Sequence, residues 1–365
     1  MIIETQQYPI HIGRDLIDRT GSLVEVRGKV FVVSSQALRA HFGDRVAASF
    51  EPVADVIAIK EGESRKTLAT ANEIVTKLLD RGAKRDSTLV AVGGGMIGDT
   101  AGFAAAIFLR GIDLVHVPTT LLAQVDSSIG GKVAVNHARG KNLIGAFHPP
   151  RAVVVDPAVL HSLPERERVS GLFEALKGGV IGDVGLFEMF EGAGGRRPAA
   201  GGSESDGSPR AAGRGLPADL DPIIDRAIRV KVNIVDVDEH EAGLRRLLNY
   251  GHTIAHGIEN AMNYEGITHG EAVAWGMIGA NAIGVRRGIL PRETSERIGR
   301  AIHALEPRRV PRSIDAKAIL GATEHDKKNT GSARVMVLPR AIGACDIVSD
   351  VTEAEIAYGI DAALA

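Results

Sequence analysis

The segment Thr88-Leu-Val-Ala-Val-Gly-Gly-Gly-Met-Ile-Gly-Asp99 places a short β-branched run directly before a glycine cluster and a stretch of small residues. This order predicts a strand, a tight turn and the start of a helix. The spacing G-x-G-x-x-G lets backbone amides approach a pyrophosphate at the amino end of a helix. The usual acidic residue about 20 positions later is absent. The segment therefore favours a phosphate-binding turn that is not an ordinary Rossmann fingerprint, and glycines that serve packing alone are the alternative.

The same pattern of strand and helix extends outward from this segment. Strands are predicted at residues 29–34, 53–59, 88–92, 113–118 and 152–156. Several of them are apolar throughout, as buried parallel strands are. Helix-like stretches at residues 67–81 and 99–108 lie between them. Such alternation predicts an α/β domain with a parallel sheet covered by helices.

After about residue 157 the strand signal fades. Helical periodicity follows at residues 164–180, 221–235, 247–262 and 269–286, so the second half is predicted to be mainly α-helical. The change predicts two domains, 1–157 and 158–365, with a substrate site between them near the carboxyl ends of the strands. Residues 192–219 are dominated by Gly, Ala, Pro, Ser and Arg, which predicts a disordered surface insertion.

Composition limits the class of function. The chain of 365 residues carries 43 Lys and Arg against 45 Asp and Glu, so its overall charge favours neither nucleic acid nor an anionic membrane as a partner. Cys345 is the single cysteine, which excludes an intrachain disulfide and a cysteine-based metal site. No apolar run approaches the ~20 residues of a membrane span, and the first residues lack the pattern of a signal peptide. We expect a soluble cytoplasmic protein.

Three histidines and one glutamate form a candidate metal site. His252 and His256 are four residues apart, on one helix face if a helix has begun by His252. His269 begins another helical stretch, and Glu174 lies within an apolar one. Two histidines and one carboxylate are a common catalytic zinc set that leaves a coordination position for substrate. Each histidine alone is more often a packing or surface residue, so only the combination indicates a metal.

Several basic residues stand beside glycines, asparagines or apolar residues rather than in amphipathic stripes. Cations that face a cleft need anions, which a substrate carrying phosphate and carboxylate would supply. Solvated helix faces are the alternative for each residue alone. The residues are Arg110, Lys132, Lys141, Lys177, Lys231, Arg245, Lys327 and Lys328.

Taken in order along the chain, these motifs resemble those of the 3-dehydroquinate synthases in the sugar-phosphate cyclase superfamily. The resemblance covers nearly the whole chain except residues 192–219. The segments that carry it are Glu63-Ser-Arg-Lys66, the glycine run, Phe108-Leu-Arg-Gly111, Pro118-Thr-Thr120, Gln124-Val-Asp-Ser-Ser-Ile-Gly-Gly-Lys132, Gly140-Lys-Asn142, Glu174-Ala-Leu-Lys177, Leu247-Leu-Asn-Tyr-Gly-His-Thr253, His269-Gly-Glu271 and Asp326-Lys-Lys328.

The resemblance implies an N-terminal Rossmann-like, NAD-binding α/β domain at residues 1–157. It also implies a mainly α-helical metal- and substrate-binding domain at residues 158–365, a dehydroquinate synthase-like fold. Zinc or cobalt would be bound by Glu174, His252 and His269. NAD would be bound by Glu63, Lys66, Gly94, Gly95, Met96, Asp99, Thr119, Thr120, Leu122, Asp126, Ser127, Lys141, Ser162, Leu163 and Glu167. Substrate would be surrounded by Arg110, Lys132, Asn142, Lys177, Lys231, Arg245, Asn249, His256 and one of Lys327 and Lys328.

The reaction implied by the resemblance converts 3-deoxy-D-arabino-heptulosonate 7-phosphate to 3-dehydroquinate and phosphate. Transient oxidation by NAD, phosphate elimination, re-reduction and an intramolecular aldol closure follow one another. Lysines and Arg110 would hold one substrate conformer through these steps. The resemblance also implies a homodimer.

The sequence departs from the family pattern at a few positions, and it is compatible with rival functions. Ser170 and Phe173 stand where family members often have Asn and Ala, and Ser34-Ser35 stand where many have an Asp near the adenosine. The rival functions are an aminodehydroquinate synthase or another sugar-phosphate cyclase, a metal-dependent polyol dehydrogenase, and a non-catalytic metabolite-binding protein. Arg245, Asn249 and His256 favour a carboxylated substrate.

Overall fold

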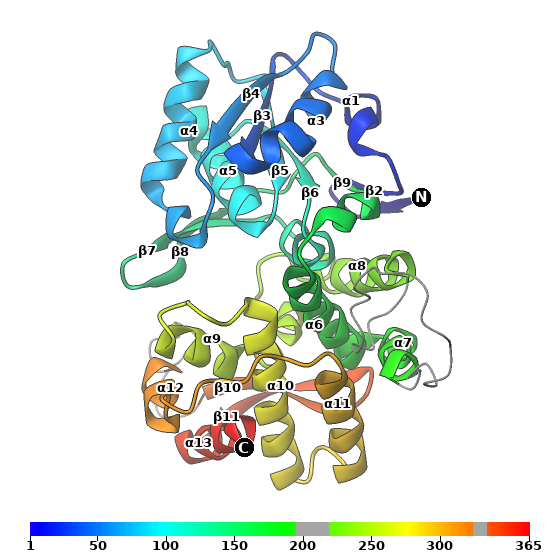
Figure 1. Ribbon diagram of the computed structural model, residues 1–365, viewed down its shortest axis with the longest axis vertical. Coiled ribbons are helices and arrows are strands. Elements are labelled where there is room, and N and C mark those ends of the chain that lie inside the picture. Colours follow the sequence, from blue (N-terminus) through cyan, green and yellow to red (C-terminus); the bar gives the residue numbers. More distant parts are fainter. Residues whose placement is uncertain (195–218, 324–333) are drawn as a thin grey trace, which may run out of the picture. The chain divides into compact units, whose positions relative to one another are not determined.

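The computed structural model describes residues 1–194, 219–323 and 334–365. Most of the predicted insertion, and the candidates Lys327 and Lys328, lie outside the described residues. The chain forms two compact units (Figure 1). The first contains Met1–Gly171 and Lys231–His240, and the second contains Leu172–Val230 and Glu241–Ala365. The first unit thus extends beyond residue 157, where the change of composition placed the boundary.

The first unit is built on a seven-stranded sheet with the order β1-β2-β9-β6-β5-β3-β4. β1 and β2 pair antiparallel, whereas the other neighbouring strands pair parallel. The strands of this sheet are β1 (Ile2–Glu4), β2 (Pro9–Ile12), β3 (Val30–Ser35), β4 (Asp55–Ile59), β5 (Thr88–Gly93), β6 (Asp113–Pro118) and β9 (Ala152–Val155).

Two longer helices and a separate hairpin complete the core of this unit. Apolar residues of β3 to β6 pack with those of α4 (Leu68–Asp80), α5 (Gly95–Ile107) and β7 in one buried cluster. The hairpin pairs β7 (Lys132–His137) with β8 (Gly140–Phe147). The short helices are α1 (Thr20–Leu23), α2 (Gln36–Leu38), α3 (Asp44–Ala48) and the 3₁₀ or π turns η1 (Ile17–Arg19), η2 (Arg39–Gly43), η3 (Glu63–Arg65), η4 (Phe108–Arg110), η5 (Ala123–Ser127) and η6 (Pro157–Ser162).

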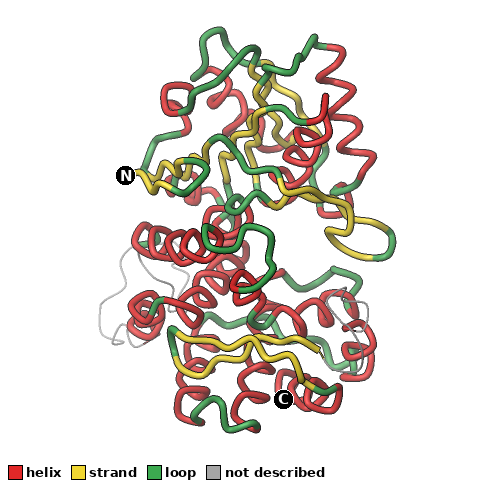
Figure 2. Tube along the Cα trace, turned by 180° about the vertical axis from the view of Figure 1, so that it is seen from behind, coloured by secondary structure: helices red, strands yellow, loops and turns green. Residues whose placement is uncertain are grey.

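In its described residues the second unit is mainly helical, with an antiparallel hairpin of β10 and β11 (Figure 2). Its central helix α10 is buried on most of its surface, as a helix packed on several sides must be. The elements are α6 (Glu165–Gly182) and α8 (Asp221–Val235), which cross the unit boundary, with α7 (Val184–Gly194), η7 (Leu244–Asn249), α9 (His252–Ala261), α10 (His269–Arg286), α11 (Arg292–Ala304), α12 (Ala316–Thr323), β10 (Arg334–Ala341), β11 (Ala344–Val351) and α13 (Glu353–Leu364).

The structure confirms the predicted fold class and all five predicted strands to within a few residues. The sequence missed β1, β2 and both hairpins. The helix predicted at 247–262 is wrong in its first turn, because Leu244–Asn249 is a 3₁₀ helix and α9 begins only at His252. Gly251 causes the break, since its φ of 80° is left-handed and cannot continue a helix. Among the helices of the described residues, none is both long and apolar enough to cross a bilayer.

Candidate active site

The glycine turn of the first unit joins β5 to α5. Gly94 is the residue before the first turn of α5, so the free amides of that turn lie beside it. A Cβ on Gly94 would lie 2.9 Å from the Thr120 side chain, and one on Gly95 would lie 3.1 Å from the Ser127 hydroxyl. Side chains would therefore fill the space beside the free amides. The turn fits a pyrophosphate, which the positive end of a helix attracts.

The neighbouring strand brings the two candidate threonines to this turn. Gly93 on β5 pairs in register with Pro118 on β6, and the amide of Thr119 donates to the Gly93 carbonyl at 3.0 Å. The hydroxyl of Thr120 accepts from the amide of Ala123 at 3.2 Å, which fixes the start of the next turn. The carboxyl ends of two adjacent parallel strands thus meet where such folds bind ligands.

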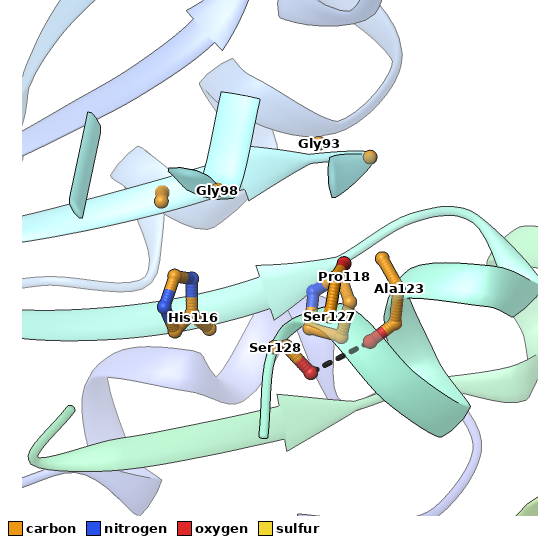
Figure 3. Close-up of a pocket in the computed structure, with 9 residues that line it drawn as sticks. Gly93, Gly98, His116, Pro118, Ala123, Ser127 and Ser128 are labelled. Carbon is orange, nitrogen blue, oxygen red and sulfur yellow. Dashed lines mark hydrogen bonds between the residues drawn. The ribbon is translucent and has the colours of Figure 1, made fainter. Parts of the chain in front are cut away.

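A small cavity of about 10 Å³ lies under the glycine turn (Figure 3). This is room for about one water molecule. His116 of β6 lines it together with Gly98 and Ser128, and the Ser128 hydroxyl donates to the carbonyl of Ala123. Burial lowers the pKa of His116 to about 4, so its imidazole is neutral at neutral pH. No pattern in the sequence marks His116 as a candidate.

A buried lysine connects the predicted cofactor residues to the β7–β8 hairpin. The Lys66 ammonium lies 2.5 Å from the Asp99 carboxylate and 2.6 Å from the side-chain oxygen of Asn142. Asn136 extends this network, because its amide donates to Glu63 at 2.8 Å and its oxygen accepts from the Asn142 backbone at 2.9 Å. Burial raises the pKa of Asp99, and the positive charge of Lys66 opposes that rise. Four predicted residues therefore form one network, and Asn136 is its unpredicted member.

The remaining candidates of the first unit are more dispersed. Lys231 forms an ion pair with Asp126 of η5. Arg110 is exposed at the end of η4, with a left-handed φ of 73°, and in the described part of the chain no hydrogen bond or ion pair joins it to another candidate. Lys132 is exposed at the start of β7. The structure places the others as follows: Met96 in the first turn of α5, Leu122 just before η5, Lys141 in β8, Ser162 at the end of η6, Leu163 just after it and Glu167 in the first turn of α6.

The second unit brings the three predicted metal ligands together. Glu174 lies in the middle of α6, whereas His252 and His269 are the first residues of α9 and α10. Nε2 of His252 lies 3.9 Å from Oε1 of Glu174, and Nε2 of His269 lies 3.6 Å from the same oxygen. One ligand atom from each residue falls within 4.8 Å of the others. These distances suit three ligands around one ion.

Close helix packing creates this convergence. A Cβ on Gly276 of α10 would lie 2.0 Å from the Gly251 carbonyl oxygen, so only glycine allows the start of α9 to approach α10 this closely. The hydroxyl of Thr268 accepts from the amide of Glu271 and fixes the first turn of α10, which carries His269. The backbone at the ends of both helices thus sets the positions of both imidazoles.

The surroundings of the three side chains fit a divalent ion. Both carboxylate oxygens of Glu174 are buried, and the charge on Oε2 is compensated by the Lys177 ammonium at 2.5 Å. Nδ1 of His252 lies 3.2 Å from the Tyr250 carbonyl oxygen, which can only accept a hydrogen bond, so Nδ1 carries the proton and the lone pair is on Nε2. Burial, with the positive charge of Lys177, holds the pKa of His252 well below its ordinary value. A neutral imidazole and a buried carboxylate are ligands that a zinc or cobalt ion binds.

Other predicted residues surround this cluster. The Lys177 ammonium donates to the carbonyl of Leu248 at 2.8 Å and lies 2.5 Å from Glu174. The ring of His256 lies 5.4 Å from that of His252 and is exposed, next to the ligand set but outside it. Arg245 is buried in η7.

Sequence reasoning missed two carboxylates in this unit. Glu241 accepts from the side-chain amide of Asn249 at 2.6 Å, and Glu259 contacts His269. A signal for Glu259 was present, because it follows His252 and His256 at the spacing of one helix face. Glu241 gave no such signal, since it lies in an irregular segment with a left-handed φ of 59°.

Comparison with known proteins agrees with this arrangement. The family model described as 3-dehydroquinate synthase N-terminal matches residues 56–170, and the one described as 3-dehydroquinate synthase C-terminal matches residues 171–329. A 3-dehydroquinate synthase of Desulforamulus reducens is 40% identical over 361 residues, which are 96% of each chain. One of Solibacter usitatus is 39% identical and covers 100% of this chain and 99% of its own.

Solved structures of related synthases share the whole fold. A 2-deoxy-scyllo-inosose synthase complexed with carbaglucose-6-phosphate, NAD⁺ and Co²⁺ has a TM-score of 0.81 at 28% identity, covering 98% of this chain and 99% of its own. A 2-epi-5-epi-valiolone synthase of Streptomyces hygroscopicus with NAD⁺ and Zn²⁺ has a TM-score of 0.83 at 26% identity, covering 99% and 98%. The fold and its two clusters define a dehydroquinate synthase-like protein. Within this class, the chain belongs to the 3-dehydroquinate synthase family.

Proposed function

We propose that the protein converts 3-deoxy-D-arabino-heptulosonate 7-phosphate to 3-dehydroquinate and phosphate, a step in the shikimate route to aromatic amino acids. The observation that carries this proposal is the convergence of Glu174, His252 and His269 on one ion-sized position. It occurs in a chain that is 40% identical to a 3-dehydroquinate synthase over 96% of both lengths. The enzyme is then a phosphate-eliminating carbon–oxygen lyase.

The cofactors of the proposed reaction are NAD and a divalent metal, Zn²⁺ or Co²⁺. The related synthases whose structures contain NAD⁺ with Co²⁺ or Zn²⁺ support this choice. Gly94, Gly95 and Thr120 would hold the pyrophosphate of NAD, and the Glu174 cluster would hold the ion. When bound, NAD supplies reversible hydride acceptance and the ion supplies Lewis acidity.

The basic residues have a positioning role in this proposal. The positive charges for the phosphate and carboxylate of the substrate would come from Arg110, Lys132, Lys141, Lys177, Lys231 and Arg245. Holding both anionic groups keeps a single conformer through several consecutive steps, which lowers the entropic cost of each. Glu241 fixes the side-chain amide of Asn249 by accepting a hydrogen bond from it, and Asn249 can then hydrogen-bond to substrate. Exposed His256 can transfer a proton to or from substrate, and the departing phosphate can also accept one.

A turnover assay tests the proposed function. The purified protein is incubated with heptulosonate phosphate, NAD and Zn²⁺, and release of inorganic phosphate is followed. Phosphate should appear without net accumulation of NADH, because the hydride that is removed is returned. Absence of phosphate release would refute the proposal, and net NADH formation would indicate a polyol dehydrogenase.

Two variants test whether turnover depends on the metal cluster. Glu174→Gln keeps the size of the side chain but removes the charged ligand, so turnover and bound zinc should fall at least about 100-fold. Glu188→Gln removes an exposed carboxylate of α7 in the same unit and should change neither. Equal zinc content and turnover in Glu174→Gln and the unaltered protein would contradict the proposed ligand set.

We also propose that the protein acts in the cytoplasm as a homodimer. The substrate class supports the location, since phosphorylated sugars and NAD are cytoplasmic metabolites. The assembly follows from the resemblance to the family and is tested by sedimentation equilibrium. A single species with the mass of one chain, at micromolar concentration with NAD and zinc present, would contradict it.

A further inference from the structure

Glu259 occupies an unusual position on α9. It lies seven residues after His252 and three after His256, so the three side chains follow one face of the helix. It is 3% exposed and lies in the last turn of a helix that ends at Ala261. A negative charge near the carboxyl end of a helix is unfavourable, and burial of a carboxylate adds a desolvation cost. Local helix energetics therefore do not account for this residue.

The contact with His269 accounts for the buried carboxylate of Glu259. Oε2 of Glu259 lies 3.4 Å from Nδ1 of His269, at the long end of the hydrogen-bond range. Nε2 of the same ring lies 3.6 Å from Glu174. The imidazole is thus placed between two carboxylates, with one nitrogen toward each. A carboxylate cannot donate a proton when ionised, so Glu259 selects the form of His269 that carries its proton on Nδ1.

We propose that Glu259 is a positioning residue for the metal site, which holds His269 with its Nε2 lone pair directed at the ion. The inference rests on the metal cluster of the proposed function. Glu259 acts through His269, whereas His252 receives the same constraint from the backbone carbonyl of Tyr250. A carboxylate acceptor also raises the basicity of the ring more than a neutral carbonyl does, which strengthens His269 as a ligand.

Zinc affinity of the full-length protein tests this role. Loss of an outer-shell partner typically weakens metal binding 10–100-fold, so Glu259→Leu should weaken zinc affinity by about that factor in competition with a chromophoric chelator. Glu259→Gln keeps an acceptor oxygen but loses the charge, and its affinity should lie between those of Glu259→Leu and the unaltered protein. Glu271→Gln is the matched control, because it alters a buried carboxylate of the same region that can still cap α10 as glutamine.

A spectroscopic readout separates positioning from a merely structural role. In zinc-loaded protein, the Nδ1 proton of His269 should appear as a slowly exchanging resonance in long-range ¹H–¹⁵N spectra. Glu259→Leu should remove or shift it, whereas the Nδ1 proton of His252 should stay unchanged as an internal reference. Unaltered zinc affinity in both Glu259 variants, or an unchanged His269 resonance, would overturn the inference. Failure of the unaltered protein to bind zinc would instead overturn the metal cluster itself, and this inference with it.

Discussion

The ammonium nitrogen of Lys177 lies 2.5 Å from a carboxylate oxygen of Glu174, three residues earlier on α6, and the two side chains are 3% and 1% exposed. Lys177 contacts Oε2 of Glu174, whereas both histidines face Oε1, so Lys177 and the proposed ion would share one carboxylate. The positive charge of Lys177 compensates the buried carboxylate of Glu174 in the protein without metal. The same charge opposes the approach of a dication, so Lys177 and the ion compete electrostatically for Glu174.

Removal of Lys177 should therefore affect the protein without metal more than the zinc-loaded protein. Breaking a buried ion pair by deleting one partner typically costs 3–5 kcal/mol, so Lys177→Met should lower the free energy of unfolding by about 3 kcal/mol in the presence of a chelator. Zinc neutralises the carboxylate left behind, and the stabilisation by zinc should be larger in the variant. Urea denaturation with chelator and with zinc measures both values.

Lys77→Met is the matched control for this experiment. Lys77 pairs with Glu73 one turn away on α4 at 2.8 Å, but the two side chains are 33% and 37% exposed. Such a surface pair contributes about 0.5 kcal/mol or less. A similar loss of stability in Lys77→Met and Lys177→Met, or an equal effect of zinc on Lys177→Met and the unaltered protein, would contradict the role of the buried pair.

The sequence predicted elements better than it predicted contacts. Strands such as β3 and β5 are buried runs of β-branched residues, and their pattern is local. The β7–β8 hairpin is part exposed and its polar and apolar residues are mixed, so no such run marks it. The hairpin β10–β11 was missed for a related reason, because most residues of β11 are not buried.

The candidate site could also be predicted only in part, because local patterns do not record contacts between distant residues. Glu174, His252 and His269 could be named from residue types and the family resemblance, but they lie on three separate helices. Their convergence depends on the close approach of Gly251 and Gly276, which no local pattern records. Asn136 and His116 were missed because a single polar residue within a strand is common and carries no spacing signal.

The Lys66–Asp99 pair should contribute to both stability and cofactor binding. Lys66→Met would leave the Asp99 carboxylate without its cation and should cost about 3 kcal/mol of unfolding free energy. The double variant Lys66→Met/Asp99→Leu removes both charges and should be more stable than the single variant. Denaturation curves measure the stabilities of the single and double variants, and a fluorescence titration measures their affinity for NAD. A double variant whose destabilisation equals the sum of the two single ones would show that the residues act independently.

Discrimination between NAD and NADP should be weak in this chain. β3 ends at Ser35, and Ser34 pairs in register with Val92 at the end of β5, so the end of β3 is adjacent to the glycine turn. An acidic residue near this position in many dinucleotide-binding folds contacts the ribose and disfavours a 2′-phosphate. Without an acidic residue at this position, the affinities for NAD and NADP should differ by less than about tenfold, because its negative charge is not there to oppose the 2′-phosphate.

Ser35→Asp tests the discrimination without disturbing the helix that follows. The Ser35 hydroxyl accepts from the Leu38 amide at 3.1 Å as the cap of α2, and Asp caps equally well. The variant should raise the preference for NAD by about tenfold or more through like-charge repulsion. Ser22→Asp, at an exposed serine of α1, is the control and should leave the ratio unchanged. An unaltered ratio in Ser35→Asp would place the ribose elsewhere.

His116 should make the stability of the protein sensitive to mild acid. In the unfolded chain its imidazole binds a proton near the ordinary pKa of 6.5, whereas in the folded protein burial lowers that pKa to about 4. The unfolded state therefore binds more protons between these values, so stability is retained above pH 6.5 and lost as the pH falls toward 4. Between pH 7.5 and pH 5, protonation of this group in the unfolded chain should lower the free energy of unfolding by about 2 kcal/mol.

His116→Gln should lose less stability than the unaltered protein over that interval in urea titrations. His161→Gln, at an exposed histidine, should follow the unaltered protein. Parallel pH profiles for His116→Gln and the unaltered protein would show that the buried imidazole takes up its proton as readily as an exposed one, and that the cavity under the glycine turn admits the charge.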